Sequence, residues 1–243
     1  KFLNELAECN INATAISQLK NGIALNSNPR SIKKLPGYSD GLWVVQDRSS
    51  QWVAPLLNAQ PGERVLDACG APGGKSTHLA EIMQNKGDLW VVDRSEDRLQ
   101  KISINAARLG CDCINLFKAD VIDLPRLKPE WTGYFQRILL DAPCSGLGTR
   151  ARHPDARWRI SSEQIHELVE LQSKLLEIAL LLLSPSGRLV YSTCTIHPDE
   201  NTNQIKKLVA RNSDLVLIRD HQIWPSKQHS GDGFYAAVLD RHS

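Results

Sequence analysis

Two cysteines lie directly after short apolar runs in the second half of the chain. Cys144 stands in the stretch LDAPCSG and Cys194 in the stretch YSTCTIHPDEN. A cysteine thiolate is a strong nucleophile, whereas a buried thiol is usually an inert, small apolar group. If both runs form neighbouring strands, their ends bring the two sulfurs to one crevice. Asp141 precedes Cys144, and its charge opposes thiolate formation unless it bonds to substrate or to Lys75.

A glycine-rich turn follows an earlier apolar run. The stretch DACGAPGGKS covers residues 67–76. Its glycines let a ligand approach the backbone, and the start of the helix that follows favours an anion. It is not a Walker A loop, because only three residues separate Gly70 from the Gly-Lys-Ser sequence and Cys69 occupies the place of the first glycine. The dinucleotide pattern GxGxxG does not occur there either.

Two acidic residues stand after the next two apolar runs. Asp93 lies about 20 residues beyond the glycines, where a nucleoside-binding α/β sheet holds ribose hydroxyls. Asp120 ends the following run, near the place of an adenine edge. Each acid alone is more often a solvated strand-end residue. A glycine turn together with both acids predicts a nucleoside ligand without a required phosphate, such as S-adenosylmethionine.

The elements that position these residues alternate regularly from Glu63 onward. Short β-branched or leucine-rich runs alternate with longer helical patterns, which indicates a parallel sheet with crossover helices. The predicted strands are Arg64–Ala68, Asp88–Asp93, Cys113–Ala119, Arg137–Asp141, Gly187–Thr193, Asp214–Asp220 and Tyr235–Asp240. The predicted helices are Lys75–Gln84, Glu96–Leu109, Glu163–Leu183 and Asp199–Arg211. In such sheets ligands bind outside the carboxyl ends of the strands.

The third of these helices carries the clearest pattern. Ser161 and Gln164 form a capping box, and an apolar stripe interrupted only by Gln172 should face the sheet. No helix separates the last two predicted strands, so they can pair antiparallel. We expect an α/β fold, an open and mostly parallel seven-stranded Rossmann-like sheet with helices on both faces and the last strand antiparallel.

Composition bounds the class of protein. The chain has 243 residues, 42% of them apolar, and a net charge of +2, which is modest for a nucleic-acid binder. Its longest apolar run has six residues, against the roughly 20 that a membrane span needs, and no signal peptide is visible. The six cysteines have no CxxC spacing, so we expect no metal site and a reducing, cytoplasmic location.

The first 60 residues differ from the rest. Short extended pieces alternate there with turn formers such as Asn21-Gly22 and Pro36-Gly37, and Pro61-Gly62 closes the section. We expect residues 1–60 to be a small N-terminal α+β remnant with the segment that leads into the sheet. Residues 61–243 are expected to form the catalytic domain.

Five stretches, in this order, resemble the Nop/Sun family of RNA cytosine-5 methyltransferases: LDACGAPGGKS, VVDRSEDRL, AD, DAPCSGLGT and YSTCTIHPDEN. Within the family they are most similar to the bacterial Sun (Fmu) group, which acts on 16S ribosomal RNA. VQDRSSQW, RHPDARW and DGFYAAVL support the resemblance, which covers roughly residues 35–240. Pro-Cys and Thr-Cys at successive strand ends are its most specific part.

The resemblance implies methyl transfer from S-adenosylmethionine to carbon 5 of a cytidine in RNA. Carbon 5 becomes nucleophilic only after a thiolate adds at carbon 6. The resemblance assigns this nucleophile to Cys194, the resolution of the adduct to Cys144 and a hydrogen bond to the cytosine edge to Asp141. The cofactor site that it implies comprises Cys69, Gly70, Ala71, Pro72, Gly73, Gly74, Lys75, Asp93, Asp120 and Asp141.

The substrate implied is RNA, with unassembled small-subunit ribosomal RNA the expected partner of a monomeric protein. Reaching a stacked base costs a few kcal/mol unless the RNA is already single-stranded. A basic segment soon after Cys144 suits phosphate contact and stacking. Its candidate RNA-binding residues are Arg150, Arg152, Arg157 and Trp158.

The sequence disfavours three alternative interpretations. In DNA cytosine-5 methyltransferases the Pro-Cys cysteine attacks and no Thr-Cys partner is expected, which the sequence around Cys194 disfavours. A P-loop nucleotide hydrolase is disfavoured by the loop length. A catalytically silent RNA-binding module is disfavoured because both cysteines and all three acids are present.

Overall fold

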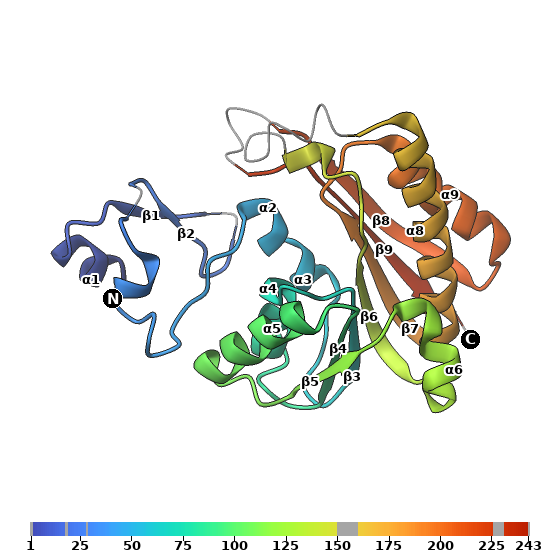
Figure 1. The fold of residues 1–243 in the computed structure, drawn as a ribbon, viewed down its shortest axis with the longest axis horizontal. Coiled ribbons are helices and arrows are strands. Elements are labelled where there is room, and N and C mark those ends of the chain that lie inside the picture. Colours follow the sequence, from blue (N-terminus) through green and yellow to red (C-terminus); the bar gives the residue numbers. More distant parts are fainter. Residues whose placement is uncertain (1, 18, 28, 150–159, 226–230, 243) are drawn as a thin grey trace.

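The computed structural model describes residues 2–17, 19–27, 29–149, 160–225 and 231–242. It shows a small N-terminal unit beside a larger α/β unit (Figure 1). The N-terminal unit contains helix α1 (Phe2–Glu8), the antiparallel pair β1 (Ala13–Ala15) and β2 (Ile23–Leu25), and the 3-10 turn η1 (Ile32–Lys34). Its short strands match the alternation of extended pieces and turns in the sequence.

The larger unit is built on a seven-stranded sheet of order β5-β4-β3-β6-β7-β9-β8. Its strands are β3 (Arg64–Ala68), β4 (Asp88–Asp93), β5 (Ile114–Lys118), β6 (Phe135–Asp141), β7 (Leu183–Thr193), β8 (Leu215–Ile223) and β9 (Phe234–Arg241). The pairs from β5 to β7 are parallel, and β9 is antiparallel to both of its neighbours. The predicted fold class is confirmed.

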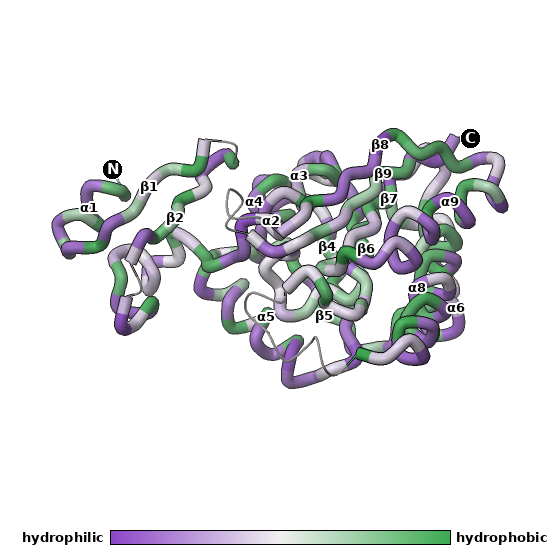
Figure 2. The backbone as a smooth tube through the Cα atoms, turned by 90° about the horizontal axis from the view of Figure 1, so that it is seen from above, coloured by the Kyte–Doolittle hydropathy of each residue, from purple (hydrophilic) through white to green (hydrophobic). Residues whose placement is uncertain are grey.

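Helices cover both faces of the sheet (Figure 1). They are α2 (Arg48–Gln51), α3 (Val53–Leu56), α4 (Gly74–Ile82), α5 (Glu96–Leu109), α6 (Leu124–Leu127), α8 (Ser162–Leu182) and α9 (Thr202–Arg211). Alternate strand residues point to opposite faces. Val65 therefore packs in the core under α3, α4 and α5, whereas Leu66 packs in the core under α8 and α9. In Figure 2 the hydrophobic residues concentrate in the sheet and its covering helices.

Helix α8 begins with the predicted capping box between Ser161 and Gln164. The side chains of its apolar stripe are buried against the sheet: Leu175, Leu176, Ala179 and Leu182. Gln172, the polar interruption of that stripe, is itself fully buried. The burial of a long amide at the centre of the stripe indicates that it has hydrogen-bond partners inside the protein.

One predicted helix is divided. The pattern indicated a continuous helix from Asp199 to Arg211, but the chain forms a 3-10 turn, η5 (Pro198–Glu200), and α9 begins at Thr202. Asn201 interrupts the helix with φ −119° and ψ −105°. Its side-chain amide donates to Gln222 Oε1 on β8 at 2.9 Å, so a tertiary contact outweighs local helix propensity here.

Arg108, in the last turn of α5, joins the N-terminal unit to the α/β unit. Its guanidinium donates to the carbonyl oxygens of Tyr38 at 2.7 Å and Trp43 at 3.2 Å, and it lies 4.1 Å from the centre of the Tyr38 ring. Gly41 packs directly against the backbone of Arg108, where a Cβ atom would come within 1.9 Å of the carbonyl oxygen. This interface fixes the unit beside α5.

This contact makes Gly41→Ala a test of the interface. Gly41 has φ +69° and Gly62 has φ +91°, but a Cβ on Gly62 would meet no atom within 4 Å. Both substitutions carry the left-handed backbone cost of about 1 kcal/mol, and Gly41→Ala adds the clash with Arg108, a cost of about 1–3 kcal/mol. Hydrogen exchange of residues 2–45 should therefore accelerate in Gly41→Ala and not in Gly62→Ala. Equal exchange in both variants would contradict the contact.

Candidate active site

The predicted site residues come from one edge of the sheet, where β3 to β7 have their carboxyl ends. After β3 the chain adds β4 and β5 on one side and later β6 and β7 on the other, so the order reverses between β3 and β6. Ligands of open α/β sheets bind at such a reversal. The glycine turn lies at this point, with Asp93 and Asp120 on one side and the two cysteines on the other.

The glycine turn is packed tightly against its neighbours. Cys69 has φ +64°, and Gly73 has φ +95° as it begins α4. A Cβ on Gly70 would lie 2.5 Å from Val91 Cγ1, and one on Gly73 would lie 2.9 Å from Ile102 Cγ1. The glycines are therefore required for packing of the loop against β4 and α5, as well as leaving its backbone open to a ligand. Burial raises the pKa of Cys69 to about 12, so this thiol stays protonated.

The acid at the end of β4 is held in place by its neighbours. Asp93 is buried, and its Oδ1 accepts a hydrogen bond from the Ser95 amide at 2.9 Å. Arg98 lies 3.3 Å from Asp93 Oδ2 and also donates to the Ala71 carbonyl oxygen, so it links the acid to the glycine turn.

Asp120 occupies a different environment at the outer strand. It is exposed, and its Oδ1 caps the short turn η2 (Val121–Asp123) by accepting from the Ile122 amide at 3.0 Å. A carboxylate oxygen has two lone pairs. Asp120 therefore keeps acceptor capacity for a ligand while it shapes the turn.

Asp67 is a site residue that sequence reasoning did not single out. It is fully buried on β3, and its Oδ2 accepts from the Ser76 hydroxyl at 2.6 Å. Within the described part of the chain Oδ1 has no hydrogen-bond partner. Burial raises the pKa of Asp67 to about 7. One acid between the apolar residues Leu66 and Ala68 of the strand RVLDA was the available sequence signal.

Lys75 connects the two sides of the site. It lies in the first turn of α4, next to the glycine turn, and its Nζ lies 2.6 Å from Asp141 Oδ2 at the end of β6. Burial alone would lower the pKa of Lys75, but the contact with Asp141 outweighs it and the pKa is raised. The other oxygen of Asp141 accepts from the Ser192 hydroxyl at 2.7 Å. The negative charge of Asp141 is thus compensated beside the cysteines.

The two cysteine sulfurs are in contact. Strands β6 and β7 pair in parallel with Asp141 opposite Ser192, so the residues that follow both strands leave the sheet side by side. Cys144 Sγ lies 3.4 Å from Cys194 Sγ, and both residues are half-buried. Behind them, the Gly148 amide donates to the Cys194 carbonyl oxygen at 3.0 Å. A Cβ on Gly148 would come within 2.7 Å of that oxygen.

The two thiols have opposite tendencies to ionise. The hydrogen bond from Cys144 lowers the pKa of Cys194, and the positive charge of Lys75 acts in the same direction. The same hydrogen bond, together with burial, raises the pKa of Cys144 well above its usual value. Of the two thiols, Cys194 is therefore the one that ionises more readily, and Cys144 is the one that keeps its proton. Such a pair can offer a nucleophile next to a proton donor.

Other predictions lie outside this geometry. The candidate RNA-binding residues Arg150, Arg152, Arg157 and Trp158 fall outside the described residues. Among the residues that are described, no three His, Cys, Asp or Glu side chains could hold a metal ion, and no helix is long and apolar enough to cross a bilayer.

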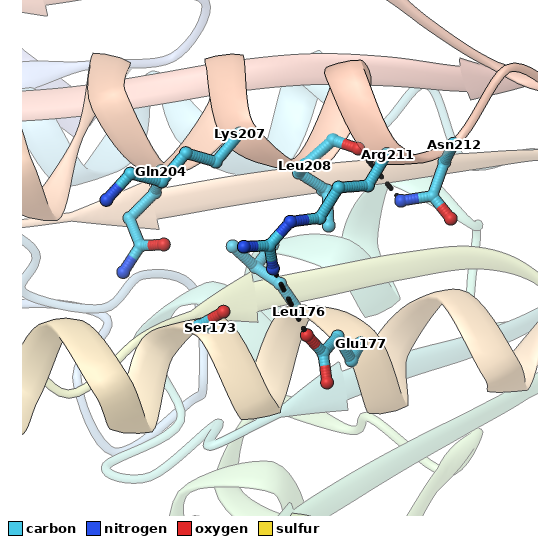
Figure 3. A pocket seen from close by; sticks show the side chains of 8 residues that line it. All are labelled: Ser173, Leu176, Glu177, Gln204, Lys207, Leu208, Arg211 and Asn212. Carbon is cyan, nitrogen blue, oxygen red and sulfur yellow. Dashed lines mark hydrogen bonds and ion pairs between the residues drawn. The ribbon is translucent and has the colours of Figure 1, made fainter.

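A groove between α8 and α9 is spanned by Arg211 and Glu177 (Figure 3). Its lining includes none of the predicted site residues.

Comparison with known proteins gives a family match over most of the chain. The family described as 16S rRNA methyltransferase RsmB/F matches residues 54–240. A probable ribosomal RNA small subunit methyltransferase B of Synechocystis sp. is 43% identical over 91% of this chain and 47% of its own length. A ribosomal RNA small subunit methyltransferase B of Shewanella oneidensis is 40% identical over 98% and 56%. The chain spans about half the length of these relatives.

Solved structures share the fold. A methyltransferase homolog protein from Pyrococcus horikoshii has a TM-score of 0.86 and 30% identity, covering 98% of this chain and 81% of that one. NSun6 from Pyrococcus horikoshii, solved with SFG, has a TM-score of 0.79 and 29% identity over 91% and 60%.

The burial of Asp67 predicts a pH dependence of stability. Its folded-state pKa is raised, so its contribution is complete below about pH 4 and is lost as the pH rises to about 7. A pKa shift from 3.8 to about 7 corresponds to a change of at most about 4 kcal/mol in the free energy of unfolding. Urea unfolding between pH 4 and 8 should show a smaller loss of stability with rising pH in Asp67→Asn than in wild type. Asp97→Asn, an exposed charge-matched control, should retain the wild-type slope, and an unchanged slope in Asp67→Asn would refute the assignment.

Proposed function

The chain belongs to the 16S rRNA methyltransferase RsmB/F family, and from this premise we propose that it methylates carbon 5 of a cytidine in small-subunit ribosomal RNA. S-adenosylmethionine would be the methyl donor, with S-adenosylhomocysteine the product. The observation that carries the proposal is the pair of sulfurs 3.4 Å apart, with Cys194 ionising more readily than Cys144. Such a pair suits a reaction in which one thiolate attaches to the base and a second group releases it.

The residues around the glycine turn suit S-adenosylmethionine. We assign Asp93 to the ribose hydroxyls, because it stands at the end of the strand next to the glycine turn, and Asp120 to the base, because its carboxylate keeps acceptor capacity. The carboxyl of Asp67 lies beside Gly70 of the turn, and its Oδ1 has no hydrogen-bond partner among the described residues, the feature expected where a ligand group or a water completes a site. The turn would hold the amino-acid end of the ligand. When bound, S-adenosylmethionine supplies an electrophilic methyl group.

Cys194 is the proposed nucleophile. Its thiolate adds to carbon 6 of cytosine, which forms an S–C6 bond and makes carbon 5 nucleophilic. After methylation, removal of the proton from carbon 5 allows the S–C6 bond to break and the thiolate to leave. We assign the acid and base work of this release to Cys144, because its sulfur touches Cys194 and favours the protonated form. Its S–H can give a proton to the ring nitrogen as Cys194 adds, and the thiolate that remains can then accept the proton from carbon 5. The electron pair of the S–C6 bond returns to Cys194, and the proton on the ring nitrogen is lost to water.

Asp141 and Lys75 are proposed to orient the base. The Asp141 carboxylate can accept a hydrogen bond from the cytosine edge. Each of its oxygens has a second lone pair beyond the contacts with Lys75 and Ser192. The base is then held between this carboxylate and the two sulfurs. Lys75 compensates the charge of Asp141, which would otherwise oppose the Cys194 thiolate.

The first test of this function removes the nucleophile. Cys194→Ala should lower methyl transfer to protein-free small-subunit ribosomal RNA by at least about a thousandfold, because the thiolate proposed to form the S–C6 bond is lost. Transfer of labelled methyl to RNA is the measurement, with calorimetric binding of S-adenosylmethionine expected to stay near wild type. Cys9→Ala, at an exposed cysteine of the N-terminal unit, is the matched control. Turnover that survives in Cys194→Ala would refute the role of Cys194.

The second test removes the releasing group. Cys144→Ala should retain attack by Cys194 but slow release, so a protein–RNA species that withstands denaturant should accumulate. Denaturing gels of protein mixed with labelled RNA and S-adenosylmethionine provide the readout. The double variant Cys144→Ala/Cys194→Ala should give no such band. Absence of the band from Cys144→Ala itself would argue against this division of roles.

A further inference from the structure

A buried glutamate lies behind the two cysteines. Glu200 is the last residue of η5 and is fully buried. Within the part of the chain that the structure describes, no lysine, arginine or histidine forms an ion pair with it. A buried carboxylate without a cation must be satisfied by hydrogen-bond donors, and its burial is costly unless they are well placed. The arrangement of those donors indicates the purpose of this residue.

The donors come from the residues that flank the cysteines. Glu200 Oε2 accepts from the Ser145 amide at 2.8 Å, and Oε1 accepts from the Ser145 hydroxyl at 2.5 Å and from the Thr195 hydroxyl at 3.1 Å. Ser145 directly follows Cys144, and Thr195 directly follows Cys194. One carboxylate therefore holds the chain immediately after each sulfur-bearing residue.

Two further contacts extend the same arrangement. Gln172, the buried polar residue of α8, donates from Nε2 to Glu200 Oε2 at 3.0 Å and to the Pro143 carbonyl oxygen at 2.9 Å. Pro143 directly precedes Cys144. Tyr191, three residues before Cys194, donates from its hydroxyl to the backbone carbonyl oxygen of Glu200 at 2.6 Å. These contacts explain why a glutamine interrupts the apolar stripe of α8.

We propose that Glu200 is a positioning residue that holds the Cys144 and Cys194 loops together so that the two sulfurs touch. It does not contact the reacting atoms; it acts through Ser145 and Thr195. Its charge also lies near Cys144, where it adds to the tendency of that thiol to stay protonated. The importance of this arrangement for catalysis rests on the proposed function, whereas the sulfur contact itself can be tested without RNA.

The test compares Glu200→Gln with Asp199→Asn, its exposed neighbour, whose side chain bonds only Asn203 among the described contacts. Each carboxylate oxygen of Glu200 accepts hydrogen bonds from two donors. Glutamine replaces one of these oxygens with an NH₂ group, so at least one donor loses its acceptor. The sulfurs should then separate, and Cys194 should lose the S–H that favours its thiolate. We expect alkylation of Cys194 by iodoacetamide at pH 7 to slow about tenfold and its pH profile to move upward.

Mass spectrometry of the peptides that contain Cys144 and Cys194 measures both rates in the whole chain. The selectivity of alkylation for Cys194 over Cys144 should fall in Glu200→Gln and stay at the wild-type value in Asp199→Asn. A folded Glu200→Gln protein with wild-type pH profiles for both thiols would overturn the proposal. If Glu200→Gln does not fold, Thr195→Val removes one donor and leaves the carboxylate in place. It must then slow alkylation of Cys194, and an unchanged rate would equally overturn the proposal.

The outcome also separates this inference from the proposed function. An altered alkylation profile in Glu200→Gln, with no methylation of cytosine by the wild-type chain, would support the positioning role and refute the activity. Methylation by wild type that Cys194→Ala abolishes, with an unaltered profile in Glu200→Gln, would support the activity and refute the positioning role.

Discussion

Parallel pairing of β6 with β7 is the constraint on which the site depends. With Asp141 opposite Ser192, the loops after both strands start at the same level of the sheet, and their cysteines meet. A shift of one residue would turn every side chain of a strand to the other face. The cores on both faces prevent such a shift, because Leu139 and Leu140 are fully buried on opposite sides. The burial of the sheet thus maintains the sulfur contact at its edge.

Electrostatics divides the site into two parts with different tasks. On one side of β3, Asp93 and Asp120 offer acceptors at the ends of neighbouring strands. On the other, the contact between Lys75 and Asp141 offsets a negative charge that would otherwise suppress a thiolate. Because Lys75 lies in the first turn of the helix that follows the glycine turn, the turn that would hold a methyl donor also places the cation beside the cysteines.

Much of this arrangement could be predicted because it depends on local pattern. Strands β3 to β6 and helices α5 and α8 have the expected periodicity, and the stretches that carry Cys144 and Cys194 follow strands as expected. The failures occurred where distant contacts outweigh local preference. The predicted helix after Cys194 is divided at Asn201, whose amide bonds to Gln222 on β8. Asp67 was missed because its importance comes from burial.

The sequence by itself determined which chemical groups the chain carries and at which strand ends they stand, because periodicity and strand order are written in neighbouring residues. Only the tertiary structure decided how those groups behave. The distribution of the proton between two sulfurs depends on their separation and on Lys75, which is far from both in the chain. The burial of Glu200 among donors from three segments likewise exists only after folding, because hydrogen bonding and desolvation depend on distances in space.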